Sequence, residues 1–299
     1  MLPWPGLIEA TARALIDATG PSAVAAASQL HVPGAALHLK SGALAEPPVL
    51  TVKANLRPVS GGAAGLIVAF DPVACTVRAV LDSADLTAMR TGAIAAVAAR
   101  QLAGPGPHTL AVLGAGPVAR QALAALSHVA DIGAVRVWSR DSSRAAQLSL
   151  TKTQPVTACD SPGQAVAGAG IVLTATPSRR PLVTGADLDA GALVLAMGAD
   201  TRGKRELGEG VLDGAELVAD VPADAAVVGE LAYLPGGADP ARCAALGELL
   251  AGRQRLRRSG VRRIVFDSVG TAVVDAAAVA LVLDAAEGAG AGALVDFAS

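Results

Sequence analysis

Aromatic residues are scarce in this chain, with one tyrosine, two tryptophans and three phenylalanines among 299 residues. A hydrophobic core of this composition has to be built from alanine, valine and leucine instead. Few aromatic side chains are present for base stacking, and the formal net charge is −2, so a nucleic-acid partner is not expected.

Cysteine is also rare. The three cysteines, Cys75, Cys159 and Cys243, have the spacing of neither a disulfide framework nor a metal site, which indicates reduced thiols in a cytoplasmic protein without a metal. The most hydrophobic stretch, Thr271–Leu283, contains Asp275 and is too short to span a bilayer. The opening residues, MLPWPGLIEATARAL, lack a basic stretch followed by an apolar run, so we expect no signal peptide and no membrane partner.

Histidine is the third scarce residue type. His31, His38, His108 and His128 match no metal-ligand or catalytic-triad spacing, and we interpret all four as structural. The chain also has no serine in a G-x-S-x-G turn, which argues against serine hydrolase chemistry.

The segment Leu81–Gly104, LDSADLTAMRTGAIAAVAARQLAG, predicts a helix that begins at Ser83 or Asp85. Four residues at helical spacing share one face of this helix: Thr87, Arg90, Thr91 and Ile94. The guanidinium of Arg90 needs a carboxylate among these small apolar neighbours, because an unpaired buried charge is costly. That carboxylate belongs either to the protein itself or to a ligand.

A dinucleotide-binding fingerprint follows, in HTLAVLGAGPVARQALAAL. This segment predicts a strand over Thr109–Leu113, a turn with Gly114, Gly116 and Ala119 at G-x-G-x-x-A spacing, and then a helix. Gly114 permits the tight turn, and Gly116 lets the backbone approach a pyrophosphate at the helix N-terminus. The sequence therefore predicts a nucleotide-binding βαβ unit.

The end of the next strand, in VRVWSRDSSR, indicates which dinucleotide binds. NAD-binding proteins typically place an acidic residue at this corner, whereas Ser139 and Arg140, with Arg144 one turn later, suit the 2′-phosphate of NADP(H). Asp141 suits the ribose 2′-OH of NAD(H) if the strand is one residue longer. We favour NADP(H), with NAD(H) as the alternative.

Strand and helix patterns divide the chain into two domains. Residues 105–270 alternate between strands and helices, which predicts an α/β domain with a Rossmann-type, doubly wound, mostly parallel sheet. Residues 1–104, completed by 271–299 with a returning helix over Thr271–Glu287, are expected to form a smaller β-rich domain for substrate binding and dimerisation. Its strands are expected to continue across a two-fold axis.

The expected elements of the small domain are two helices, Leu7–Ala18 and Pro21–Leu30, and four strands, Ala36–Lys40, Val49–Lys53, Gly65–Phe70 and Thr76–Leu81. The expected strands of the nucleotide domain are Thr109–Leu113, Val135–Trp138, Ile171–Thr174, Leu193–Met197, Leu217–Ala219 and Arg263–Phe266.

Several polar residues near strand ends are candidate site residues. Lys53 ends the apolar strand in VLTVKANL, and Asp200 follows a very apolar strand in LVLAMGAD. In doubly wound sheets the carboxyl edge faces the ligand crevice, so a carboxylate at position 200 is a strong candidate. The ATPS stretch, residues 175–178, ends the preceding strand at the same edge. Ser268 and Glu230 are weaker candidates.

Four segments resemble the ornithine cyclodeaminase/mu-crystallin family in order and spacing: LDSADLTAMRTGAIAAVAA, VLGAGPVARQAL, AMGADTRGKREL and SVGTAVVDAAA. The similarity covers nearly the whole chain, and VKANLRP resembles a shortened form of the family's Lys-containing strand. The family includes ornithine and lysine cyclodeaminases, an archaeal-type alanine dehydrogenase and ketimine reductases. The resemblance also implies a homodimer.

The resemblance implies that Lys53 and Arg90 hold a substrate carboxylate, and that Asp200 transfers a proton near the substrate nitrogen. The family commonly has another Arg for the carboxylate near Gly34, and Arg57 is the candidate that replaces it. The candidate cofactor-binding residues include those of the fingerprint and those that follow the next strand. They are Thr87, Thr91, Gly114, Ala115, Gly116, Pro117, Val118, Ser139, Arg140, Arg144, Ala175, Thr176, Pro177, Ser178, Met197, Gly198, Ser268 and Gly270.

The expected activity is NAD(P)H-dependent reduction at the C–N bond of an amino or imino acid, with a cyclic ketimine carboxylate such as pyrroline- or piperideine-2-carboxylate as substrate. The Ser139-Arg140 corner favours this reductase over an ornithine or lysine cyclodeaminase, in which bound NAD is regenerated in each cycle. A crystallin-like nucleotide-binding protein without catalysis is the third alternative. The presence of Lys53, Arg90 and Asp200 together argues against it.

Overall fold

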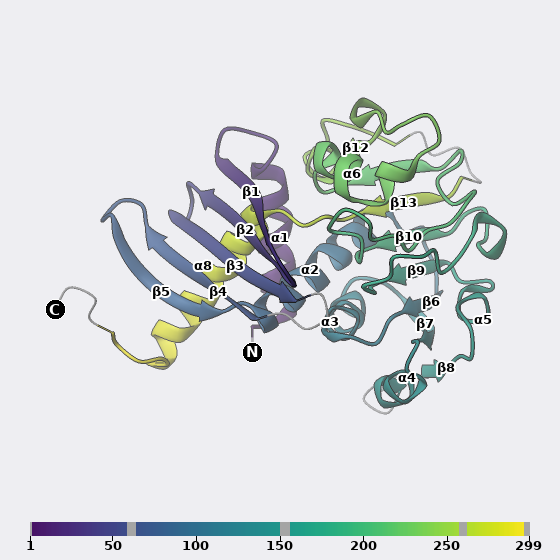
Figure 1. The fold of residues 1–299 in the computed structure, drawn as a ribbon, viewed down its shortest axis with the longest axis horizontal. Coiled ribbons are helices and arrows are strands. Elements are labelled where there is room, and N and C mark those ends of the chain that lie inside the picture. The colour runs from purple at the N-terminus through teal and green to yellow at the C-terminus, as the bar shows by residue number, and fades with distance from the viewer. Residues whose placement is uncertain (1, 59–63, 150–155, 257–261, 296–299) are drawn as a thin grey trace.

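The computed structural model describes residues 2–58, 64–149, 156–256 and 262–295. These residues form two separate β-sheets, one antiparallel and one parallel, with helices around each (Figure 1). In the described part of the chain, no helix is both long and apolar enough to cross a membrane.

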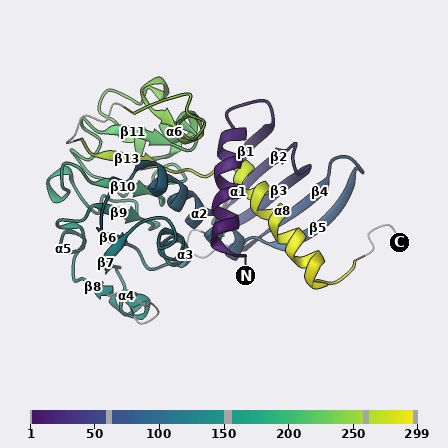
Figure 2. The same ribbon diagram turned by 180° about the vertical axis from the view of Figure 1, so that it is seen from behind.

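The antiparallel sheet has the order β1-β2-β3-β4-β5. Its strands are β1 (Ala23–Val32), β2 (Ala35–Leu44), β3 (Val49–Pro58), β4 (Ala64–Asp71) and β5 (Thr76–Asp82). Helix α8 (Ala272–Ala289) packs on one face of this sheet, and α1 (Trp4–Asp17) packs on α8, as Figure 2 shows. The opposite face, which is turned toward the viewer in Figure 1, carries no helix of the described residues.

Strand β1 corrects the helix that the sequence predicted over Pro21–Leu30. Alanine favours helices in isolation, and the segment AVAAAS therefore suggested one. All ten residues of β1 instead pair with β2 across a two-residue turn at Pro33-Gly34. The ladder of backbone hydrogen bonds outweighs the small intrinsic preference of alanine, because propensity is only a weak local term.

The second sheet has eight strands in the order β12-β11-β13-β10-β9-β6-β7-β8, and every pairing in it is parallel. Its strands are β6 (His108–Leu113), β7 (Ile132–Trp138), β8 (Val156–Ala158), β9 (Ile171–Thr174), β10 (Leu193–Ala196), β11 (Glu216–Ala219), β12 (Ala244–Ala245) and β13 (Ile264–Asp267). The order reverses between β6 and β9, which is the topological switch point of a Rossmann-type sheet. The predicted α/β fold class is confirmed.

The remaining helices are short. They are α3 (Pro117–Leu126), α4 (Ser142–Ser149), α5 (Pro162–Val166), α6 (Pro222–Val228), α7 (Leu246–Leu250), η1 (Gly185–Asp187), η2 (Glu230–Tyr233) and η3 (Pro240–Arg242).

Helix α2 (Ala84–Leu102) connects the two sheets and is almost entirely buried. It packs closely on α3 at Gly92, where the absence of a side chain permits the approach. A Cβ atom at Gly92 would lie 2.7 Å from the backbone of Gln121. Ser83 is the N-cap residue, as predicted, but its side chain does not cap the helix. Its hydroxyl donates to Asn55 Oδ1, and the carboxylate of Asp82 accepts the Ala84 N–H instead.

Candidate active site

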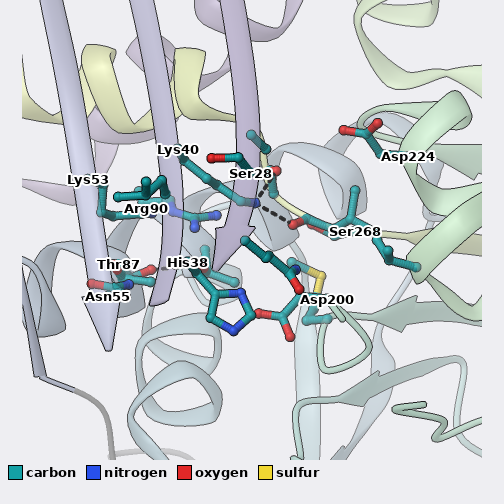
Figure 3. A pocket seen from close by; sticks show the side chains of 18 of the residues that line it. Ser28, His38, Lys40, Lys53, Asn55, Thr87, Arg90, Asp200, Asp224 and Ser268 are labelled. Carbon is teal, nitrogen blue, oxygen red and sulfur yellow. Dashed lines mark hydrogen bonds between the residues drawn. The ribbon is translucent and has the colours of Figure 1, made fainter. Parts of the chain in front are cut away.

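A cavity of about 410 Å³ lies between the antiparallel sheet and the carboxyl edge of the parallel sheet. Figure 3 shows Lys40, Lys53 and Arg90 on the side of the antiparallel sheet, and Asp200 and Ser268 on the opposite side. The sequence-predicted residues that line this cavity are Lys53, Thr87, Arg90, Thr91, Val118, Met197, Asp200, Ser268 and Gly270. Segments far apart in the sequence therefore meet at one site.

Arg90 and Lys53 share a buried carboxylate that belongs to the protein. Lys53 Nζ donates to Asp275 Oδ2 at 2.6 Å, and Arg90 Nε lies 2.8 Å from Asp275 Oδ1 without hydrogen-bond geometry. Asp275 lies in the first turn of α8, where the helix dipole favours an anion. Among the described residues, the two Nη groups of Arg90 make no hydrogen bond, so the outer edge of its guanidinium is available to a ligand in the cavity.

Burial and neighbouring charges both change the pKa values of Lys53 and Asp275. Burial and the neighbouring Arg90 lower the pKa of Lys53 to about 7, although Asp275 acts in the opposite direction. Burial raises the pKa of Asp275, but Arg90 and Lys53 outweigh this effect, so its pKa is lowered overall. Asp275 therefore stays ionised and anchors both cations.

Asp200 and Met197 reach the cavity from the segment after β10. Lys204 Nζ donates to Asp200 Oδ1 at 2.5 Å and to the Gly198 carbonyl at 3.3 Å. Both side chains of this pair are partly exposed. The carboxylate of Asp200 thus lies on the cavity wall with a cation beside it.

The two threonines of α2 differ in their hydrogen bonding. Thr91 Oγ1 donates to the Thr87 carbonyl one turn earlier, at 2.7 Å. Thr87 Oγ1 is buried and has no hydrogen-bond partner among the described residues, although Thr87 lines the cavity. An unsatisfied buried hydroxyl is costly, so this group is a candidate contact for a ligand.

The first βα turn has the geometry that a pyrophosphate requires. Gly114 has φ of +122°, and a Cβ atom there would lie 2.5 Å from the Ala175 carbonyl oxygen. A Cβ atom at Gly116, the N-cap residue of α3, would meet no described residue within 4 Å apart from its own chain neighbours, so space is open beside the helix N-terminus. Ala115 and Pro117 flank this opening. The described residues therefore fit a dinucleotide.

Strand β7 ends at Trp138, which places Ser139 and Arg140 directly after it. Arg140 is exposed and makes no ion pair with any of the described residues. Asp141 accepts hydrogen bonds from the N–H and hydroxyl of Ser143 and lies 3.4 Å from Arg144 Nε, so it caps α4. These hydrogen bonds lower the pKa of Asp141.

A buried glutamate that the sequence analysis missed holds the loops after β9 and β10. Glu206 accepts hydrogen bonds from the N–H and hydroxyl of Thr176, from Thr174 and from the N–H of Gly198. Glu230 accepts the backbone N–H groups of Glu206 and Leu207 and is itself fully buried. These two carboxylates fix the edge on which Ala175, Pro177 and Ser178 lie, and Glu230 does not reach the cavity.

Asp220 holds the segment that leads from β13 to α8. It accepts hydrogen bonds from Ser268 Oγ and from the N–H groups of Val269 and Gly270, at 2.8, 3.1 and 2.8 Å. The Ser268 hydroxyl, predicted as a cofactor contact, is thus already used within the protein, although Ser268 borders the cavity.

The cavity also contains residues that sequence patterns did not single out. His38, interpreted as structural, and Lys40 both line it from β2. Gly34, in contrast, lies in the turn between β1 and β2 and does not border the cavity. The side chain of Arg57 is outside the described residues, so its candidate role stays a prediction.

The fold and the cavity define a class of protein with a Rossmann-type dinucleotide sheet, a small antiparallel sheet and a polar site between them. Residues 53–290 match the ornithine cyclodeaminase/mu-crystallin family. An uncharacterised cyclodeaminase of Sinorhizobium fredii is 38% identical over 227 residues, which cover 73% of this chain and 68% of that protein. Ketimine reductase mu-crystallin of Mus musculus is 33% identical over 218 residues, with 73% and 68% coverage. The chain therefore belongs to the ornithine cyclodeaminase/mu-crystallin family.

Structural comparison agrees with this assignment. A solved archaeal alanine dehydrogenase dimer with bound NAD matches with a TM-score of 0.93 and 25% sequence identity, and the match covers 99% of this chain and 95% of that chain.

Proposed function

We propose that this protein reduces a cyclic ketimine carboxylate, such as pyrroline- or piperideine-2-carboxylate, with NADPH. The observation that carries the proposal is the arrangement in one cavity of a guanidinium edge, Arg90, a lysine, Lys53, and a carboxylate, Asp200, on the opposite wall. The cations suit the carboxylate of an imino acid, and the acidic group suits its nitrogen. The relatives named as a ketimine reductase and as an alanine dehydrogenase with NAD support this chemistry.

The cations act by orientation. The Nη groups of Arg90 bind the substrate carboxylate, and Lys53 adds a second contact beside it, while Asp275 keeps both side chains in place. Fixing the carboxylate fixes the adjacent C=N carbon relative to the carboxyl edge of the parallel sheet. In favourable cases, orientation of this kind contributes on the order of 7 kcal/mol to lowering a barrier.

Asp200 handles the proton. When an imine is reduced, its nitrogen gains a proton, and a carboxylic acid on the cavity wall can donate it. Gly114, Gly116 and the α3 N-terminus would hold the pyrophosphate of a dinucleotide, which would supply the hydride when bound. Thr87 and Met197 border the same space.

The direct test of this function follows absorbance at 340 nm with the purified protein, NADPH and a panel of cyclic imine carboxylates and 2-oxo acids with amines. We expect stoichiometric NADPH consumption with at least one cyclic imine carboxylate. No consumption with any member of the panel would contradict the proposal.

A cyclodeaminase is the second candidate, and one observation favours it. Asp224, in the first turn of α6, is exposed and borders the cavity, where it could bind the distal ammonium of ornithine or lysine. The cyclodeaminase of S. fredii is consistent with this alternative. Ammonia release from either diamino acid with catalytic NAD⁺, and without net NADH formation, would identify it.

Cofactor preference is expected to depend on Arg140. Arg140→Ala should weaken binding of NADPH more than that of NADH, by about 1.5–3 kcal/mol, because only NADPH has a 2′-phosphate for a charge-assisted contact. Titration of both cofactors by fluorescence or calorimetry measures this difference. Arg144→Ala tests the other candidate of this corner and should have the smaller effect, since Arg144 already lies beside Asp141. Equal losses of both cofactors in Arg140→Ala, or a wild type that prefers NADH, would contradict the assignment.

We also propose a homodimer, which forms through the uncovered face of the antiparallel sheet and not, as expected from the sequence, by continuing the strands across a two-fold axis. Strand registers place seven exposed apolar residues on this one face: Val24, Leu30, Val32, Leu56, Leu66, Val77 and Val80. An apolar surface of this extent is unusual for a monomer in water. A second copy offers the same surface and covers it in a two-fold arrangement. A solved relative is described as a dimer, which supports an assembly of two chains.

Light scattering at micromolar concentration is expected to give the mass of two chains. Val80→Lys should shift the mass to one chain, because it would bury a charge at the interface, while Val80 is already 53% exposed in the single chain. Val73→Lys, in the turn before β5, makes the same change outside the sheet and should leave the dimer intact. A wild type that is active as a stable monomer would refute the interface.

A further inference from the structure

Lys40 is a lysine of the cavity wall that forms no ion pair with a carboxylate of the described residues. It lies on β2 directly opposite Lys53 of β3, so both side chains are on the face that closes the cavity. Its Nζ donates to the carbonyls of Val269, at 2.9 Å, and Gly270, at 2.7 Å, and it forms no ion pair with the described residues. An ammonium group has three N–H bonds, so one remains for the cavity.

Gly270 brings Lys40 and Arg90 together. A Cβ atom at Gly270 would lie 2.6 Å from Arg90 Nη1, and the φ of +75° at this position also favours glycine. Asp220 holds the N–H groups of Val269 and Gly270, which fixes this segment while its carbonyls accept from Lys40. The ammonium is therefore held in position next to the guanidinium before any ligand binds.

The charges around Lys40 indicate that its ammonium group lacks an anionic partner at contact distance among the described residues. Among the described residues, Arg90 and Lys53 share the carboxylate of Asp275 at contact distance, whereas Asp275, Asp200 and Asp220 act on Lys40 without forming an ion pair with it. Burial and the charge of Arg90 lower the pKa of Lys40 and together outweigh these three carboxylates, so keeping it charged costs free energy. An anionic group of a ligand in the cavity would stabilise the charged form of Lys40 and offset this free energy.

We propose that Lys40 binds the substrate carboxylate together with Arg90 and Lys53, and thereby supplies the additional cationic contact expected near Gly34. The inference rests on the proposed function, since it takes an imino-acid carboxylate as the ligand. Gly34 cannot make this contact, because it has no side chain and does not border the cavity.

A purely structural role would have a different signature. If Lys40 only ties the Val269-Gly270 segment to the sheet, its replacement would impair every substrate equally and lower the melting temperature. A carboxylate contact instead acts only on ligands that carry a carboxylate.

The test compares two imines that differ by this one group, 1-piperideine-2-carboxylate and 1-piperideine, with NADPH as reductant. In Lys40→Met, the ratio of kcat/KM for the first imine to that for the second should fall about tenfold, mainly through KM, because a charge-assisted hydrogen bond is lost. Lys40→Arg keeps the cation and should retain most of the ratio. Binding of pyrrole-2-carboxylate to the NADPH-loaded protein, measured by calorimetry, should weaken about tenfold in Lys40→Met.

Equal losses with both imines would overturn the proposal and assign Lys40 to the segment that it ties. An unchanged ratio in Lys40→Met, with a lowered ratio in Arg57→Met, would overturn it in favour of Arg57. If the wild type reduces neither imine, the proposed function fails, but weaker binding of pyrrole-2-carboxylate to Lys40→Met would still support the carboxylate contact. No binding of this probe to the wild type would overturn both.

Discussion

Arg90→Lys is expected to lower kcat/KM for a carboxylate substrate by about 100-fold or more, roughly 3 kcal/mol. Arginine reaches two partners at once here, because Nε faces Asp275 while the Nη edge faces the cavity. A lysine has a single nitrogen and cannot keep both contacts. Steady-state kinetics measure the loss, and binding of NADPH should change little.

The matched control is Arg100→Lys, on the same helix, where the side chain is partly exposed and pairs with Glu9. This control should retain wild-type kinetics. If Arg90→Lys also has near-normal kinetics, Arg90 serves only to neutralise Asp275, which a lysine can do as well, and the assignment to the substrate carboxylate is wrong.

Asp200→Asn is expected to lower kcat by about 100-fold or more, while NADPH binds almost normally. The substitution keeps the shape of the side chain but removes the group that gains and loses a proton. Loss of the ion pair with Lys204 cannot explain such an effect. The side chains of this pair are 27% and 17% exposed, and a pair near the surface contributes about 0–1 kcal/mol.

Lys204→Met separates the two roles of Asp200. It removes the ion pair but leaves the carboxylate, and should keep turnover within about tenfold of the wild type if Asp200 transfers the proton. Wild-type turnover in Asp200→Asn, combined with a melting temperature several degrees lower, would show instead that Asp200 is a structural partner of Lys204.

Local patterns were sufficient to predict much of the fold. The glycine spacing of the first βα turn and the alternation of strands and helices depend on neighbouring residues, and the parallel sheet confirms them. Strand β1 could not be predicted in this way. Its alanines carry no periodic signal, and their conformation is decided by a hairpin with β2.

The candidate site was predicted in part for a similar reason. Arg90 was expected to meet a carboxylate, but its partner, Asp275, lies 185 positions later. The available signal was a single charged residue in the apolar helix AVVDAAAVALVLD, because a buried charge requires a partner. His38 and Lys40 lie two positions apart on β2, so their side chains share a face of the strand. Which face of β2 meets the parallel sheet is set by the packing of α2 and α8.

The candidate residues for substrate binding and the candidate residue for cofactor preference lie on different segments of the chain. The candidate carboxylate-binding groups Lys40, Lys53 and Arg90 all lie outside the parallel sheet, on β2, β3 and α2. Arg140, the candidate for cofactor preference, lies beyond β7, inside the segment that the chain enters after α2 and leaves before α8. Within this architecture, a change at Arg140 is expected to alter the choice of reductant and to leave the groups that hold the substrate carboxylate unchanged.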